Sequence, residues 1–196
     1  MTTETAQLFF SLLTFAAAAG SIVWIGVWFA ARRGHDGAAQ LGASLGEAAI
    51  WLAFLVALTC TLGSLYFSEV ADFIPCRLCW FQRIAMYPLP VILLVGALRR
   101  DRGVRWYVLP VAVIGAGIAA YHYLIEWRPE LDHGACGLTG PSCSAIWFRE
   151  FGFVTLALMS LVGFVTILTL LFFRFPATLS GRDGTESGSV QKETSL

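Results

Sequence analysis

Four of the five cysteines fall into two close pairs, and the first pair has a spacing suited to redox chemistry. Cys76 and Cys79 are three residues apart, which allows a small disulfide ring between them. Pro75 comes just before and favours a helix start, where its missing N–H would be unpaired anyway. The free N–H groups and partial positive charge of a helix N-terminus favour a thiolate, the form that attacks disulfides and electrophiles. We therefore expect a reactive thiol pair at the start of a helix.

The second pair, Cys136 and Cys143, brackets six residues that include two glycines and one proline. This composition is typical of a turn-rich loop that could bring the two sulfurs together. A static disulfide that staples the loop is one interpretation, and a Cys₄ zinc site built from both pairs is another. The presence of a CxxC pair favours a redox role, and oxidising surroundings disfavour four persistent thiolates, so we expect no metal site. Cys60 lies in an apolar segment without a partner and is expected to pack as a small hydrophobic side chain.

Two further side chains could assist these sulfurs. Arg83 lies four residues after Cys79, so both point along one face of a helix. A guanidinium at membrane depth is costly unless it has a partner or a task, although it can also snorkel to the interface. His122 lies between two tyrosines near the end of an apolar segment, where an interfacial position is the favoured interpretation. The alternative is a proton donor or hydrogen-bond partner close to Cys79.

The composition of the whole chain places these residues in a membrane protein. Of the 196 residues, 57% are hydrophobic and 13% charged, with a mean hydropathy of +0.71. Soluble domains carry about 25% charged residues, and one core of this size cannot bury so much apolar surface. Thirteen Lys and Arg balance thirteen Asp and Glu, so neither a basic nucleic-acid-binding face nor an acidic tail is expected. The lipid bilayer is the expected surrounding.

Five segments are candidates to cross that bilayer. Four of them lack Asp, Glu, Lys and Arg over at least 20 residues: residues 8–31, 48–68, 106–125 and 151–173. The fifth, residues 84–98, would reach only about 22 Å as a helix, so it must extend back to Leu78. That extension takes Cys79 and Arg83 into or beside the membrane. Pro88 and Pro90 should kink this span.

The basic residues between the spans predict the orientation. The first span has no basic residue before it and is too long for a signal peptide, so it is expected to be a retained anchor. The positive-inside rule places the N-terminus outside, the C-terminus in the cytoplasm and all four paired cysteines on the extracytoplasmic side. Residues 34–46 are expected to be a flexible cytoplasmic connector, and residues 177–196 a disordered tail. The basic residues that set this topology are Arg32, Arg33, Arg99, Arg100, Arg102, Arg105, Arg174, Arg182 and Lys192.

The run from Pro75 to Ile84, P-C-R-L-C-W-F-Q-R-I, continues into Met86-Tyr87-Pro88 and resembles the signature of the DsbB family of disulfide bond formation proteins. The resemblance extends over about residues 46–174. It implies an all-α, four-helix transmembrane bundle, here preceded by one additional N-terminal transmembrane helix that the usual family plan lacks. The expected division is therefore an extra helix and cytoplasmic loop (1–45), a DsbB-like core (46–174) and a tail (175–196).

The resemblance also implies an activity, in which a thiol:quinone oxidoreductase of the bacterial plasma membrane takes electrons from a DsbA-like thioredoxin-fold oxidase. The electrons pass to a membrane quinone, ubiquinone or menaquinone. Cys76 and Cys79 resemble the pair beside the quinone, with Cys79 meeting its ring and Arg83 its oxygen. Cys136 and Cys143 resemble the pair that serves the oxidase, with Cys136 forming the mixed disulfide. His122 corresponds more loosely to a histidine near the quinone.

Three other functions remain open from the sequence. The quinone reductases of the vitamin K epoxide reductase type also combine a helix bundle with CxxC, but the continuation Trp80-Phe81-Gln82-Arg83 argues against them. A non-enzymatic membrane anchor with two structural disulfides is the alternative from another class. A reductant exporter would reverse the electron flow, and it would need a thiol reachable from the cytoplasm, for which Cys60 is poorly placed.

Overall fold

The computed structural model describes residues 2–101, 103–132, 136, 141–173 and 175. Apart from one isolated bridge between Glu150 and Val154, the regular secondary structure of these residues is helical. The expected all-α class is confirmed. The helices are α1 (Thr3–Arg32), α2 (Asp36–Glu69), α3 (Arg77–Met86), α4 (Pro88–Leu98), α5 (Arg105–Trp127), a short 3-10 helix η1 (Pro129–Leu131) and α6 (Leu156–Phe172).

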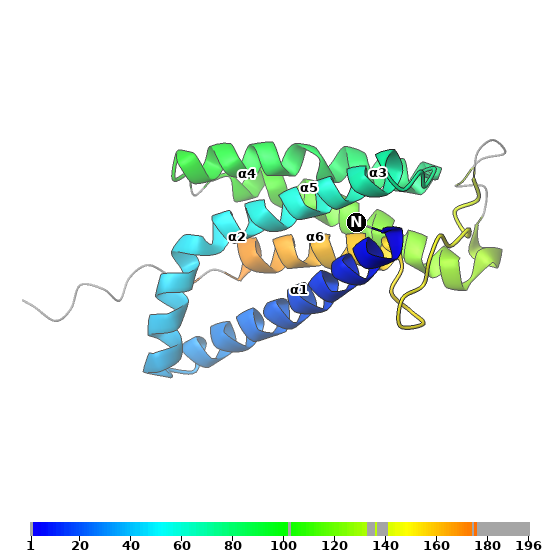
Figure 1. Ribbon diagram of the computed structural model, residues 1–196. Helices are drawn as coiled ribbons and strands as arrows, with labels where there is room; N and C mark the ends of the chain where they lie inside the picture. Colours follow the sequence, from blue (N-terminus) through cyan, green and yellow to red (C-terminus); the bar gives the residue numbers. More distant parts are fainter. Residues whose placement is uncertain (1, 102, 133–135, 137–140, 174, 176–196) are drawn as a thin grey trace, which may run out of the picture.

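The helices α2, α3–α4, α5 and α6 pack as a bundle, and α1 lies along α2 and α6 (Figure 1). The start of α3, the end of α5 and the loop before α6 lie together at one end, the right of the view. Inside the bundle, α6 presents the fully buried Phe164 to α5. A Cβ at Gly115 would overlap the ring of Phe164, so this glycine allows α5 and α6 to approach closely.

Four helical spans are long and apolar enough to cross a membrane: Thr3–Arg32, Ala48–Glu69, Arg77–Leu98 and Arg105–Trp127. Large apolar side chains on their outer faces are exposed, as lipid-facing residues must be; Ile22 and Ile84 are examples. The protein is therefore a multi-pass membrane protein.

The expected span 151–173 is wrong at its start. The final helix, α6, begins at Leu156 and has 17 residues, which gives a length of about 26 Å. Phe151 and Gly152 have φ angles of 52° and 80°, which a right-handed helix cannot accommodate. They form a tight turn closed by the Glu150–Val154 bridge. Thr155 then caps the helix by accepting the Leu158 N–H at 3.3 Å.

The third span has the interruption that its prolines predict. Helices α3 and α4 meet at Tyr87, and Pro88 takes the first position of α4, where no N–H donor is needed. The Tyr87 N–H still donates to the Arg83 carbonyl at 2.9 Å, so the chain continues in nearly the same direction. The span begins at Arg77, so it includes Cys79 and Arg83, as expected from the short apolar run at residues 84–98.

The flexible connector expected at residues 34–46 is wrong, because α2 already begins at Asp36. This segment contains three alanines and two leucines, which favour helix, together with four glycines, which do not. Gly42 and Gly46 are tolerated there because they face Phe175, and a Cβ at Gly42 would overlap its ring. The tail expected at residues 177–196 lies outside the described residues.

Candidate functional site

The CxxC pair lies at the entry to α3. Cys76 is the N-cap of the helix, and its Sγ accepts the backbone N–H of Cys79 at 3.3 Å. The two sulfurs are 3.0 Å apart and both thiols are free. Cys76 is buried, with 5% of its surface exposed, and Cys79 is partly buried. Free N–H groups at the helix start thus surround a thiol pair that is close enough to share one proton.

The second pair lies against the first. Cys136 and Cys143 are joined by a disulfide, and both are buried. They belong to one apolar cluster with Cys76 and Leu78 from the start of α3 and Ile125 from α5; Cys79, Ile118 and Tyr121 border this cluster. The structure therefore brings together four cysteines that span 68 positions of the sequence. Thiol–disulfide exchange between the pairs requires this proximity.

His122 of α5 joins the two pairs through its ring nitrogens. Its Nε2 lies 3.6 Å from the Cys76 Sγ and 3.2 Å from the Cys143 carbonyl oxygen, and its Nδ1 lies 2.9 Å from the Gln82 side-chain nitrogen. An amide nitrogen can only donate, so Nδ1 accepts and the Nε2–H points to the sulfur and the carbonyl. With 4% of its surface exposed, His122 is not interfacial, and that interpretation of the sequence is wrong.

A buried carboxylic acid, Glu126, lies one helical turn further along α5 than His122. Glu126 accepts a hydrogen bond of 2.6 Å from the Thr155 hydroxyl, which is also the N-cap of α6. Both residues are buried and border the small cavity that reaches Cys76 and Cys79. This hydrogen bond fixes the end of α5 to the start of α6. It thereby holds the His122 helix in place relative to the loop that carries the second cysteine pair.

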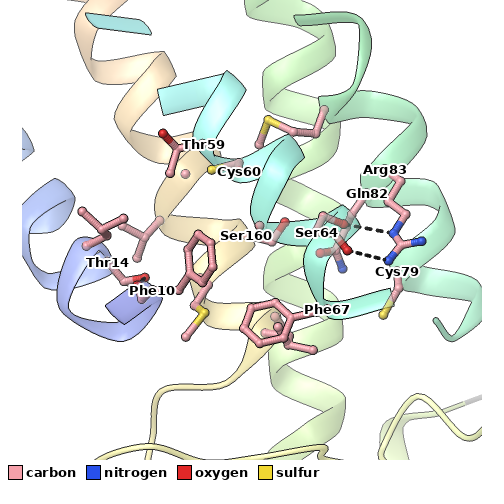
Figure 2. A pocket seen from close by; sticks show the side chains of 18 of the residues that line it. Phe10, Thr14, Thr59, Cys60, Ser64, Phe67, Cys79, Gln82, Arg83 and Ser160 are labelled. Carbon is pink, nitrogen blue, oxygen red and sulfur yellow. Dashed lines mark hydrogen bonds between the residues drawn. The ribbon is translucent and has the colours of Figure 1, made fainter. Parts of the chain in front are cut away.

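Arg83 is partly buried and lies beside Ser64 on the α3 side of a cavity (Figure 2). Its Nε donates to the Ser64 Oγ at 3.0 Å and its Nη2 to the Ser64 carbonyl at 3.1 Å, so the guanidinium bridges α3 and α2. Tyr87 donates to the same Oγ at 3.3 Å. The guanidinium also lies 5.4 Å from the centroid of the Trp80 ring. The partner that the guanidinium needs at this depth is thus Ser64 of α2.

A cavity of about 350 Å³ extends from these polar side chains into the apolar part of the bundle, a size within the range of small-molecule sites. Cys79, Gln82, Arg83, Ser64 and Tyr87 border it, and most of the remaining wall is apolar. A lipid-soluble ring with polar oxygens fits this arrangement, because donors are grouped at one end of an otherwise apolar space. Aromatic rings of Phe67, Phe73 and Trp147 line the cavity near the cysteine end and stack on one another.

The surroundings of Cys76 lower the pKa of its thiol well below the ordinary value. The hydrogen bond from the Cys79 thiol is the largest cause. His122 and the backbone N–H of Cys79 add further hydrogen bonds, while burial opposes all three. Cys76 is therefore the sulfur that carries the negative charge of the reduced pair at neutral pH.

The same group of atoms could bind a soft divalent metal. The ligand atoms of Cys76, Cys79 and His122 all lie within 4.8 Å of one another, and thiolate and imidazole are common zinc ligands. The Cys₄ arrangement considered from the sequence is not formed, because the disulfide removes Cys136 and Cys143 as thiolates.

Sequence reasoning missed three members of this site. Glu126 lies four residues after His122, so its place on the same helix face was a readable signal. Gln82 stood inside the motif but had no assigned role. Ser64 could not be recognised from the sequence, because its hydrogen bond to Arg83 depends on the packing of α2 against α3.

The lowered pKa of Cys76 predicts how its alkylation depends on pH. In a Cys136→Ser/Cys143→Ser background, the midpoint of Cys76 alkylation, read by mass spectrometry, should lie below the ordinary thiol value of about 8.5. Cys79→Ala removes the main hydrogen-bond donor and should raise the midpoint, whereas Cys79→Ser retains a hydroxyl donor and should raise it less. A midpoint near 8.5 in all three proteins would contradict the electrostatic assignment.

Comparison with known proteins agrees with this geometry. The family model described as "Disulfide bond formation protein DsbB" matches residues 46–174. The "Disulfide bond formation protein C" of Bacillus subtilis is 43% identical over 122 residues, which cover 62% of this chain and 88% of the relative. The "Probable disulfide formation protein" of Coxiella burnetii strain Dugway is 42% identical over 132 residues, 67% of this chain and 88% of the relative. No solved structure gives a significant match. With its family match spanning both cysteine pairs and the helices that hold them, the chain belongs to the DsbB family of disulfide bond formation proteins.

Proposed function

We propose that this membrane protein is a thiol:quinone oxidoreductase that reoxidises a DsbA-like thioredoxin-fold partner and passes the electrons to a membrane quinone. The observation that carries the proposal is the meeting of both cysteine pairs around buried His122, next to a cavity bordered by Cys79 and Arg83. Two structural disulfides would need neither a free CxxC pair nor a cavity beside it. The family match also favours this function over the vitamin K epoxide reductase alternative.

The first exchange takes place at the Cys136–Cys143 disulfide. A thiolate of the reduced partner attacks Cys136, the disulfide breaks, and Cys143 leaves as a thiolate. The second thiol of the partner then attacks the mixed disulfide, so that the partner leaves oxidised and Cys136 becomes a thiolate. Two electrons and the two thiol protons have left the partner, and the electrons now reside on Cys136 and Cys143.

The second exchange moves the electrons to the CxxC pair. The Cys143 thiolate attacks Cys76 in the Cys76–Cys79 disulfide and releases Cys79. The Cys136 thiolate then attacks Cys143, which restores the outer disulfide and releases Cys76. The lowered pKa of Cys76 makes it a good leaving group in this step. The bonding described above, with the outer pair joined and the inner pair free, corresponds to the product of this exchange.

The residues around the cavity fit a quinone, with ubiquinone and menaquinone both compatible. When bound, a quinone would accept two electrons and two protons and leave Cys76 and Cys79 as a disulfide. Cys79 would face its ring, and Arg83, fixed by Ser64, would hold positive charge near its oxygen. His122 contacts Cys76 and also borders the cavity, so its Nε2–H can donate to the Cys76 sulfur and stabilise its thiolate.

Turnover with a reduced DsbA-like protein, followed by the absorbance change of added quinone, tests this function. Cys79→Ser should give no quinone reduction. Arg83→Gln removes charge aimed at the quinone oxygen and should lower the rate by about 10²-fold, with Arg83→Lys intermediate because it lacks the planar fork. Arg99→Gln, at the far end of α4, is the control and should retain the wild-type rate. Undiminished turnover by Cys79→Ser would support the anchor alternative.

We also propose that the cysteine end faces the extracytoplasmic side of a bacterial plasma membrane. The basic residues of the chain support this orientation, since Arg32 and Arg33 end α1 and Arg99 and Arg100 follow α4, both at the end opposite the cysteines. In the same orientation the N-terminus lies outside and the C-terminus inside.

A maleimide that cannot cross membranes tests the orientation. In intact cells, we expect it to label a Glu69→Cys protein, whose new thiol is exposed at the end of α2 nearest the cysteine pairs. A matched probe is Ser44→Cys, an exposed position early in α2, which should be labelled only after the cells are permeabilised. The opposite pattern would reverse the topology and remove access of an extracytoplasmic partner to the outer disulfide.

A further inference from the structure

The additional helix α1 lies outside the segment that matches the family, yet it forms one wall of the cavity. Its contribution consists of five residues over two helical turns: Phe10, Leu13, Thr14, Ala16 and Ala17. The other lining residues of the cavity belong to segments within the family match. The cavity of this protein is therefore bounded partly by an element that the family match does not include.

The α3 side of the cavity is polar, and the α1 side is mainly apolar, because the hydroxyl of Thr14 there donates to the Phe10 carbonyl of its own helix at 2.8 Å. In Figure 2 the side chains of Cys79, Gln82 and Arg83 lie on the α3 side, and Phe10 and Thr14 of α1 lie on the opposite side. Helix α2 passes between them. A ligand that fills the whole space must therefore carry polar atoms at one end and an extended apolar part at the other.

Helix α1 is fixed at both ends of this wall. Toward its C-terminus the Ser21 hydroxyl donates to the Thr166 Oγ1 at 3.1 Å, and the Trp24 Nε1 donates to the Phe173 carbonyl at 2.8 Å. Toward its N-terminus Phe10 packs on Phe67, with ring centroids 5.5 Å apart. Between these attachments Ala16 and Ala17 have small side chains. The space on the α1 side of the cavity therefore exists because small residues lie on a helix that is held at both ends.

From this arrangement we infer that α1 completes the quinone site by binding the isoprenoid tail; the inference rests on the proposed function. An isoprenoid chain is apolar and extended, as the space between α2 and α1 requires. Because lipid tails are equally apolar, removal from water contributes little, and the affinity must come from close packing along the alanine wall. Leu13 and Leu55, which border the cavity, are exposed on α1 and α2. The tail would therefore leave toward the lipid between these helices.

Two pairs of quinones that share a ring and differ in the tail test the inference: menaquinone-4 with menadione, and ubiquinone-2 with ubiquinone-0. Binding to the full-length protein in detergent is followed by quenching of tryptophan fluorescence, since Trp147 lines the cavity. Ala17→Leu fills the wall and should weaken binding of the tailed member of a pair about tenfold, or 1.4 kcal/mol, relative to the tailless one. Ala19→Leu, exposed on the same helix and away from the cavity, is the control and should bind as the unaltered protein does.

Ala16→Leu, at a more exposed position of the same wall, provides a second variant if Ala17→Leu does not fold. It should also weaken the tailed quinones selectively. Equal loss of tailed and tailless quinones, or no loss of either, would overturn the role of α1 while leaving the proposed function intact. Failure of the unaltered protein to bind any of the four quinones would overturn both.

Discussion

The buried imidazole of His122 is the interaction on which the arrangement of the site depends. It touches a sulfur of one cysteine pair, a backbone carbonyl of the other, and the amide of Gln82. A polar ring inside an apolar bundle is tolerated only when its nitrogens have partners, so these three contacts satisfy the ring and restrict its orientation. The same contacts hold the start of α3 and the loop before α6 against α5. The ring nitrogens of His122 therefore both hold these segments together and contact the cysteine pairs.

The shortness of the third apolar run explains much of the remaining architecture. The membrane-spanning helix must start at Arg77, so a reactive thiol and a guanidinium lie within the span. The guanidinium is tolerated because Ser64 accepts two of its hydrogen bonds, which in turn ties α3 to α2. The cohesion of α3 with α2 and the proposed stabilisation of a quinone oxygen therefore depend on one side chain. Helix α1 then covers the other side of the cavity that this packing leaves.

The sequence was sufficient for features governed by local rules. The CxxC pair at a helix start, the break at the prolines after Tyr87 and four of the spans all follow from short-range constraints on the backbone and on apolar length. The features that the sequence did not predict depend on tertiary contacts. His122 appeared interfacial because the partners that bury it come from two other segments. The α6 start at Leu156 depends on a turn at Phe151, and the early start of α2 depends on packing against Phe175.

In the proposed function, electrons pass directly from the outer cysteine pair to the CxxC pair through Cys76 and Cys143. A Cys79→Ser/Cys136→Ser protein leaves those two sulfurs without their usual partners, and mild oxidation followed by mass spectrometry of unreduced peptides can identify the bond they form. We expect an intramolecular disulfide between Cys76 and Cys143. Two sulfurs that remain unlinked under conditions that restore the Cys136–Cys143 bond in the unaltered protein would contradict it.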